Sequence, residues 1–387
     1  MKLLFVCNNL HIGGIQKSLL NLLSEIKNRH DITLFLFYPE GELMGDVPQN
    51  VKILRGNCFT RIMGMSQAEA KQKGFFTFLH RSFWAAATKA FGTKFPFGVL
   101  SRMQKIKGEY DAAISFSQNS EYKLFYGGCN EFAVNAVSAR EKISFVHCDF
   151  KHYAGNNAYN KSYYKNFDKI ACVSDSVRDV FISECPEYKD KTVTVLNCYD
   201  FEKMKSLADA YSPQHADGVL NIFTAARIST EKGIMRMLPI FKNLKERAYK
   251  FNWRIAGDGV LFDLAKAERD KLGLSDCVDF LGALGNPYPF FAGSDLLLVP
   301  SYDEAAPMVF GEAEYFNLPI LTTDTTSAKE LVEDRNIGFA VENNDSAIEE
   351  KLVEILQNPD LLKEKTNSAE ISNDTALLQF EKLISEA

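Results

Sequence analysis

Short apolar runs alternate along the whole chain with segments of helical periodicity. Ten such runs predict β-strands: Lys2–Val6, Ile32–Phe37, Ala112–Phe116, Ile143–Val146, Lys169–Val173, Leu220–Ala226, Trp253–Ala256, Val278–Leu281, Asp295–Val299 and Pro319–Leu321. Between them, apolar residues recur at helical spacing, as they do from Ile234 to Leu244. Near-continuous apolar strands separated by helices are typical of parallel sheets that are covered on both faces. The pattern therefore predicts an α/β protein.

The chain is long enough for two domains. A single hydrophobic core rarely grows to 387 residues, so two domains are the natural expectation. The polar segment 197–218 lacks a clear strand and separates two sets of strand–helix alternation. We expect one domain over residues 1–198 and a second over residues 199–360. Residues 361–387 have a helical composition, and we expect them to cross back and pack on the first domain.

Composition narrows the class of protein. Apolar residues make up 46% of the chain and charged residues 24%, as in globular proteins. The eight cysteines form no Cys-x-x-Cys pair and no cluster with histidine, which argues against a zinc or redox site and fits a reducing cytoplasm. No apolar stretch approaches the ~20 residues that span a bilayer, and the first apolar run is too short for a signal peptide. We expect a cytoplasmic protein.

One stretch of the chain is strongly cationic. Residues 71–108 carry eight basic and no acidic residues, whereas the remainder carries 36 basic and 50 acidic residues. The same stretch holds eight aromatic residues: Phe75, Phe76, Phe78, Phe83, Trp84, Phe91, Phe95 and Phe97. Interleaved basic and aromatic residues suit peripheral contact with an anionic membrane surface. They suit equally a core helix whose aromatics face inward and whose lysines face water. The overall acidity and the absence of a known module disfavour nucleic-acid binding.

Two acids separated by seven residues stand out in the second half. Glu304 and Glu312 follow a predicted strand and flank Pro307, a residue suited to the first turn of a helix. A helix N-terminus offers unpaired N–H groups and a positive dipole end, so it attracts phosphate. Glu304 would stand at the mouth of such an anion site, and Glu312 further along could accept hydrogen bonds from ribose hydroxyls. This arrangement predicts a nucleotide-sugar site.

Two cations follow another predicted strand. Arg227 and Lys232 lie between that strand and a helix, at the sheet edge where ligands bind in open α/β folds. Two cations there can hold a diphosphate and stabilise charge on a leaving group. The alternative is a solvated loop in which Lys232 pairs with Glu231 or Asp258. Because the chain has no Asp-x-Asp pair after a strand, we expect no metal and no cofactor.

Two further features lie in the first half. Gly13 and Gly14 follow the first strand, where a glycine pair lets the backbone approach a phosphate or sugar, or simply makes a tight turn. The pattern Gly-x-Gly-x-x-Gly is absent there, which argues against a nicotinamide enzyme. His147 ends another strand and could bind a sugar hydroxyl or a phosphate oxygen, or be a satisfied structural group.

Taken together, these motifs resemble one family. The chain is similar to the retaining glycosyltransferases with the GT-B fold, the GT4 group of glycosyltransferase family 1 domains. The matching motifs are Gly13-Gly14, His147, Asn197-x-x-Asp200, Arg227–Gly233, Gly257-Asp258-Gly259, Phe280-Leu281-Gly282 and Glu304–Glu312. The chain departs from the usual pattern at Ala305, where glycine is common, and at Gln16, where an acid is frequent, so the donor's identity stays open.

The resemblance implies two facing Rossmann-like domains, with the donor bound mainly by the second and the acceptor by the first. It implies donor-binding roles for Gly13, Gly14, Arg227, Lys232, Ala306, Met308, Val309 and Glu312. Within that set, the two cations would hold the diphosphate, three backbone N–H groups would cap it, and Glu312 would bind the ribose. Catalytic roles are implied for His147, near the reacting carbon, and for Glu304, on the transferred sugar.

The resemblance also implies a reaction. A hexosyltransferase of this kind moves a sugar, with retention of configuration, from a nucleoside-diphosphate sugar, expected to be UDP-linked. The expected acceptor is a lipid-linked surface polysaccharide or a glycolipid. Two alternatives remain at this point: a soluble sugar or sugar-phosphate acceptor, and a non-catalytic two-domain sugar-binding protein.

Overall fold

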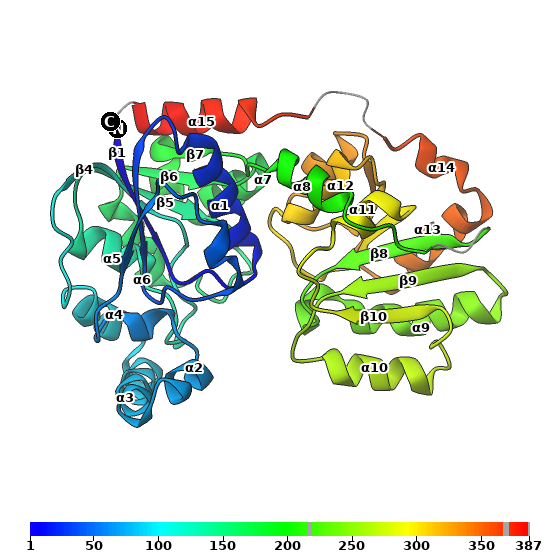
Figure 1. Ribbon diagram of the computed structural model, residues 1–387, viewed down its shortest axis with the longest axis horizontal. Helices are drawn as coiled ribbons and strands as arrows, with labels where there is room; N and C mark the ends of the chain where they lie inside the picture. Colours follow the sequence, from blue (N-terminus) through cyan, green and yellow to red (C-terminus); the bar gives the residue numbers. More distant parts are fainter. Residues whose placement is uncertain (215–217, 367–370, 386–387) are drawn as a thin grey trace. The chain divides into compact units, whose positions relative to one another are not determined.

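The chain divides into two compact units. A computed structural model describes residues 1–214, 218–366 and 371–385, and its units are Met1–Tyr199 with Ser372–Ala387, and Asp200–Ile371 (Figure 1). The boundaries lie at 199/200 and 371/372, whereas we expected 198/199 and 360/361. The second differs because helix α14 (Asp360–Lys363) still buries Leu362 in the core of the second unit.

The first unit contains a seven-stranded parallel sheet in the order β3-β2-β1-β4-β5-β6-β7. Its strands are β1 (Lys2–Cys7), β2 (Asp31–Leu36), β3 (Lys52–Arg55), β4 (Glu109–Ser115), β5 (Ser138–Val146), β6 (Lys169–Cys172) and β7 (Thr192–Thr194). Strand β1 is central, and Phe5 pairs with Leu34 of β2 and Ile114 of β4. Residues 3–6 of β1 are fully buried, as expected of a strand covered on both faces.

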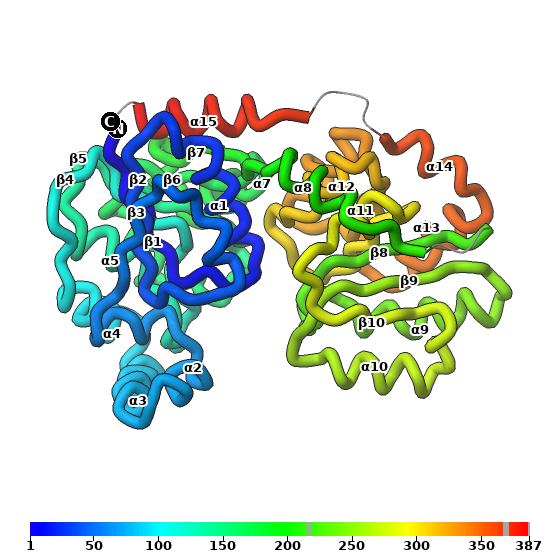
Figure 2. The backbone as a smooth tube through the Cα atoms, viewed as in Figure 1, coloured from blue at the N-terminus to red at the C-terminus, as the bar shows by residue number. Residues whose placement is uncertain are grey.

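The first unit also contains α-helices. They are α1 (Gly14–Ile26), α2 (Gln67–Gln72), α3 (Phe75–Phe91), α4 (Lys94–Leu100), α5 (Cys129–Ala136), α6 (Ala158–Tyr163), α7 (Asp175–Glu184) and the C-terminal α15 (Asp374–Ser385). Helix α15 belongs to the first unit: Phe380 stacks on Phe5 with ring centroids 6.2 Å apart, and Lys169 Nζ donates to the Leu383 carbonyl at 2.8 Å. Figure 2 shows the start of β1 close to the end of α15. None of the helices in the described ranges is long and apolar enough to cross a membrane.

The second unit contains a six-stranded parallel sheet in the order β10-β9-β8-β11-β12-β13. Its strands are β8 (Leu220–Ala225), β9 (Phe251–Ala256), β10 (Val278–Gly282), β11 (Leu296–Val299), β12 (Ile320–Thr323) and β13 (Gly338–Val341). Besides α14, its helices are α8 (Phe201–Ala208), α9 (Ile234–Glu246), α10 (Phe262–Lys271), α11 (Tyr288–Gly293), α12 (Met308–Tyr315) and α13 (Asp345–Gln357). Trp253 of β9 is fully buried and stacks on Phe241 of α9 at 4.7 Å.

The predicted α/β class is confirmed, and all ten predicted strands are present. Three strands were missed: β3, β7 and β13. Strand β3 is mostly exposed, β7 has only three residues, and β13 keeps three of its four residues partly exposed. Each lies at an edge of its sheet. Strands β3 and β7 are short and contain polar residues, so they lack the continuous apolar run on which the prediction depended.

Candidate functional site

The loops that follow β8, β9 and β11 pack tightly together at the carboxyl edge of the second sheet. Gly257 has a φ of +152°, and a Cβ there would lie 1.8 Å from the Ala226 carbonyl oxygen. Gly233 has a φ of +69°, and a Cβ there would lie 1.9 Å from the Pro300 carbonyl oxygen. Both conformations and both contacts require glycine. The glycines therefore hold the loop of residues 226–233 against its two neighbours.

This packing joins two residues that are 72 positions apart in the sequence. Lys232 Nζ lies 2.6 Å from Glu304 Oε1, and the two side chains are only 19% and 12% exposed. Ser301 Oγ donates to the same carboxylate oxygen at 2.9 Å. The alternative pairing of Lys232 with Glu231 or Asp258 is thus wrong, since Glu304 is its partner. A partly buried cation and a carboxylate stand together at the edge where ligands bind in this type of fold.

A second layer of contacts holds the loop that carries Glu304. Asn343 Nδ2 donates to the Tyr302 carbonyl at 3.0 Å, and Arg236 Nη1 donates to Asn343 Oδ1 at 2.7 Å. The Arg236 guanidinium also lies over the Tyr302 ring, 4.3 Å from its centroid, and its Nε donates to Asp345 Oδ1 at 2.7 Å. Sequence reasoning missed Arg236, Asn343 and Ser301. The sequence did contain a signal for Arg236, because a charged residue stands between Ile234 and Met237 on the apolar face of the predicted helix.

Helix α12 begins beside Glu304 and carries no capping side chain. Pro307 has an extended backbone (φ −67°, ψ 132°), so it precedes the helix as its N-cap, and Met308 is the first helical residue. The prediction had placed Pro307 within the first turn; the helix starts one residue later. The first N–H groups of a helix have no intrahelical acceptor, so those of Met308 and Val309 are available to an anion. Ala306 lies just before this turn and is partly exposed.

The other two charged residues of the predicted donor site differ in exposure. Arg227 is exposed, and in the described part of the chain its side chain makes no hydrogen bond or ion pair. Glu312, one turn into α12, is only 2% exposed, and Tyr288 of α11 donates to its Oε1 at 3.3 Å. Arg227 therefore offers a guanidinium at the surface, whereas Glu312 is held inside the fold by a neighbouring helix.

In the first unit, the predicted residues lie at the carboxyl edge of its sheet. Strand β4 pairs with β1 on one side and β5 on the other, so the segments that follow β1 and β5 end at the same edge. Gly13 and Gly14 follow β1; Gly13 is the uncapped N-cap of α1 and has an extended backbone, with φ −171°. His147 follows β5, and its backbone N–H donates to Gln118 Oε1 at 3.2 Å.

The imidazole of His147 packs against two aromatic rings. Its ring lies 4.9 Å from that of Phe116 and stacks on Phe145 at 5.8 Å. Its Nε2 atom is buried and has no hydrogen-bond partner among the described residues. Because burial penalises the charged form, it lowers the pKa of His147 from 6.5 to about 3. His147 is therefore neutral near pH 7 and can act as a hydrogen-bonding group rather than as a cation.

This burial predicts a specific acid sensitivity. Between pH 6.5 and pH 5, the unfolded chain protonates this histidine and the folded chain does not, so the free energy of unfolding falls as the pH falls. The expected loss is about 1.4 kcal/mol per pH unit below the unfolded pKa. His147→Phe removes the titrating group and should flatten this slope. Urea unfolding at pH 5 and pH 7 measures the change in the free energy of unfolding with pH. The same change in the variant and in the wild type would contradict a buried neutral imidazole.

Residues 211–371 match the family model of the glycosyl transferases group 1. This stretch of the chain is similar to a glycosyl transferases group 1 domain. The domain covers nearly all of the second unit and contains Arg227, Lys232, Glu304 and Glu312.

Several relatives of the group 1 domain have names that describe their function. A GalNAc-α-(1→4)-GalNAc-α-(1→3)-diNAcBac-PP-undecaprenol α-1,4-N-acetyl-D-galactosaminyltransferase of Campylobacter jejuni is 23% identical over 389 residues, which cover 95% of this chain and 92% of that enzyme. The capsular polysaccharide biosynthesis glycosyltransferase CapM of Staphylococcus aureus is 28% identical over 50% of this chain and 53% of its own. An uncharacterized glycosyltransferase of Methanocaldococcus jannaschii is 27% identical, and the match spans only 44% of each chain.

Solved structures share the fold of the whole chain. Anabaena HepE, in complex with UDP and glucose, has a TM-score of 0.70 at 16% identity and covers 100% of both chains. S. aureus TarM, in complex with fondaparinux, α-GlcNAc-glycerol and UDP, has a TM-score of 0.70 at 12% identity and covers 99% of both chains. At these identities the likeness establishes the fold alone. Two Rossmann-like units with parallel sheets and these neighbours make the chain a GT-B protein, as predicted.

Proposed function

We propose that this chain transfers a hexose from a UDP-linked sugar to a lipid-linked surface polysaccharide or glycolipid, with retention of configuration. The observation that carries the proposal is the pair of Lys232 and Glu304, which stands beside the uncapped start of α12. A cation and helix N–H groups suit a diphosphate, and an adjacent carboxylate suits sugar hydroxyls. The match to the group 1 family supports the same chemistry.

In this proposal, protein groups neutralise the leaving diphosphate. Arg227 and Lys232 supply two positive charges, and the N–H groups at the start of α12 supply oriented dipoles. Backbone N–H groups of Ala306, Met308 and Val309 donate to the phosphate oxygens. Since these groups can provide the charge that a divalent ion supplies elsewhere, we propose that the reaction needs no metal and no cofactor.

The proposed transfer uses two side chains near the sugar. The leaving diphosphate accepts the proton of the incoming hydroxyl on the same face of the sugar, so configuration is retained without a second carboxylate acting as nucleophile. Glu304 orients the sugar and stabilises positive charge that develops at its reacting carbon. Neutral His147 offers a hydrogen bond to the sugar, Gly13 and Gly14 let the β1–α1 loop approach the donor, and Glu312 binds the ribose.

The acceptor is proposed from the relative that aligns over nearly the whole chain. The name of the Campylobacter enzyme specifies an undecaprenol-diphosphate-linked glycan, and that enzyme aligns with 95% of this chain. If the chain transferred sugar only to soluble sugars or sugar phosphates, and not to a polyprenyl-diphosphate glycan, the lipid-linked acceptor would be contradicted and a soluble acceptor would take its place. A chain that binds nucleotide sugars without transferring or hydrolysing them would contradict catalysis.

Thermal unfolding in the presence of nucleotides tests the donor site. At about one hundred times its dissociation constant, UDP should raise the melting temperature of the second unit by about 5 °C or more, because it binds only the folded state. GDP is the comparison for the base, and uridine is the comparison for the diphosphate. We expect the same shift, and the same rate of transfer, with EDTA present. The absence of a shift with any nucleotide, or a shift that EDTA abolishes, would contradict the proposed site.

A further inference from the structure

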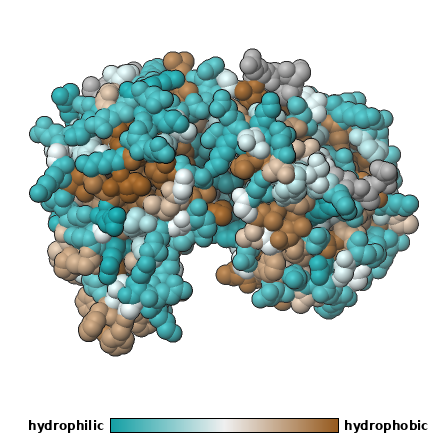
Figure 3. All heavy atoms as spheres, viewed as in Figure 1, coloured by the Kyte–Doolittle hydropathy of each residue, from teal (hydrophilic) through white to brown (hydrophobic). Residues whose placement is uncertain are grey.

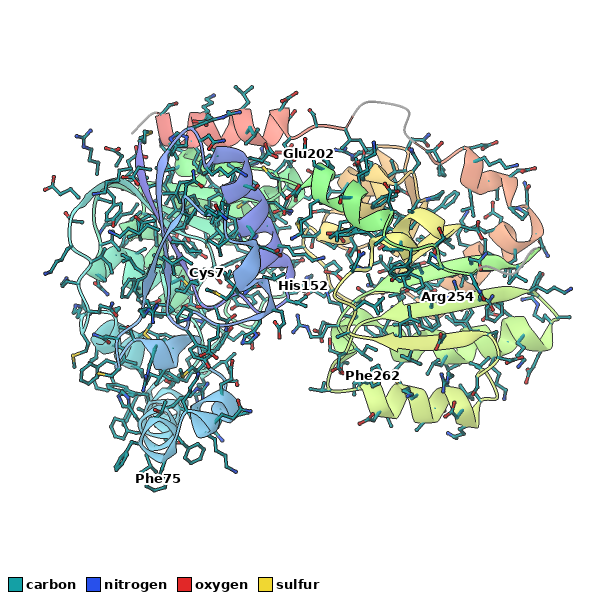
Figure 4. All side chains as sticks on the ribbon, viewed as in Figure 1. Cys7, Phe75, His152, Glu202, Arg254 and Phe262 are labelled. Atoms are coloured by element: carbon teal, nitrogen blue, oxygen red, sulfur yellow. The ribbon has the colours of Figure 1, made fainter. Side chains whose placement is uncertain are left out.

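Helix α3 of the first unit presents an apolar face to solvent. Five of its large apolar side chains are exposed: Phe75 by 68%, Phe76 by 85%, Leu79 by 46%, Phe83 by 63% and Phe91 by 74%. Phe95, at the start of α4, extends this surface with 54% exposure. Figure 4 places Phe75 at the outer end of the first unit, and Figure 3 shows hydrophobic atoms gathered there. We call these six residues the α3 surface.

The buried face of the same helix is polar. Thr77, Arg81 and Thr88 are its buried residues, and they lie on the side that packs on the protein. Arg81 Nε donates to the Met65 carbonyl at 2.7 Å, and its Nη2 donates to the Phe125 carbonyl at 2.9 Å. A helix on the surface of a water-soluble domain normally buries its apolar side and exposes its polar side. In α3 the two sides are exchanged.

This reversal decides between the two interpretations of residues 71–108. The core-helix interpretation required the aromatics to face inward, and it is wrong for Phe75, Phe76, Phe83, Phe91 and Phe95. Only Phe97 of the stretch's phenylalanines is fully buried. A contiguous exposed apolar surface of this kind marks an interaction site.

Exposed lysines stand at both ends of the α3 surface. Lys71 lies in α2, just before it, and Lys89 and Lys94 lie at its far end. None of these three makes an ion pair among the described residues, whereas Lys73 pairs with Glu40. Residues 71–108 contain no acid, so all the charged side chains of this stretch are basic. The surface is thus an apolar centre with a cationic border.

We propose that the α3 surface docks onto an anionic lipid bilayer, with α3 lying in the plane of the interface. The phenylalanines enter the boundary between headgroups and acyl chains, and the lysines remain at the level of the phosphates. Both features are matched by a bilayer, because its apolar interior lies directly below a layer of negative charge. The inference deepens the proposed function and rests on it only for the link to a lipid-linked acceptor.

Vesicle co-sedimentation of the full chain, without donor or acceptor, tests the docking. We expect binding to phosphatidylcholine vesicles that contain phosphatidylglycerol, weaker binding to phosphatidylcholine alone, and release at high salt. F76S/F83S should weaken binding by roughly tenfold or more, since two exposed apolar side chains are lost. K89E/K94E should weaken binding to the anionic vesicles alone. Both pairs are exposed, so the melting temperature should be unchanged.

Matched controls use the same unit. L378S removes an exposed apolar side chain from α15, and K189E reverses an exposed charge far from α3 in sequence; both should bind as the wild type does. Wild-type binding that does not depend on anionic lipid, or F76S/F83S binding at full strength, would overturn the proposal. So would a dimer in solution that F76S/F83S dissociates, since the surface would then serve a second copy. Because no sugar is transferred in this assay, its outcome is independent of the proposed activity.

Discussion

Glu304→Gln is expected to lower the kcat of sugar transfer by roughly 10²- to 10³-fold, the usual effect of removing one preorganised electrostatic group. Glutamine keeps the size of the side chain and its hydrogen bond with Ser301 but loses the negative charge. In the proposed mechanism this charge acts mainly when positive charge develops on the sugar. UDP affinity should therefore stay within about threefold of the wild type, well under 1.4 kcal/mol.

Steady-state kinetics and UDP titration measure the two effects separately. Glu246→Gln is the control, since it removes a carboxylate from the exposed end of α9, where it pairs with Lys242 at 3.6 Å. We expect that control to match the wild type in both measurements. An equal loss of UDP binding and of kcat in Glu304→Gln would show that Glu304 acts in binding rather than in the transfer step.

Lys232→Met is expected to weaken UDP binding by roughly 10- to 100-fold, because hydrogen bonds to charged groups contribute about 1.5–3 kcal/mol. The variant also leaves the Glu304 carboxylate, 12% exposed, without its cation and close to the incoming phosphates. Affinity for uridine should not change, since uridine has no phosphate. Calorimetric titration with UDP and with uridine measures the difference. Lys242→Met, which changes a partly exposed lysine on α9, is the matched control.

The double variant Lys232→Met/Glu304→Gln distinguishes a phosphate-binding lysine from a structural one. Removing both charges relieves the unpaired carboxylate, so the double variant should regain much of the thermal stability lost in Lys232→Met. UDP binding should stay weak if Lys232 contacts the diphosphate. Recovery of UDP affinity together with stability would mean that Lys232 serves only to neutralise Glu304.

Sequence reasoning could bring together the charged residues of the proposed donor site because these residues lie at the ends of strands. Lys232 follows β8 and Glu304 follows β11, and these strands are neighbours in the sheet. Runs of apolar residues locate such strands, and the carboxyl ends of parallel strands meet at one edge. The prediction that both residues serve one site needed only the positions of these strands in the sequence. Their direct ion pair depends on the loops after each strand, whose conformation is set by contacts with other loops.

The chain's amino-acid pattern by itself determined the α/β class, ten of the strands and the charged groups at their ends, because the period of apolar residues is a local property. The tertiary structure alone decided three matters. It paired Lys232 with Glu304, placed Arg236 behind the loop that carries Glu304, and turned the phenylalanines of α3 outward. Each depends on which distant segments pack together: Arg81 finds its acceptors in Met65 and Phe125, and this contact orients the polar face of α3 inward.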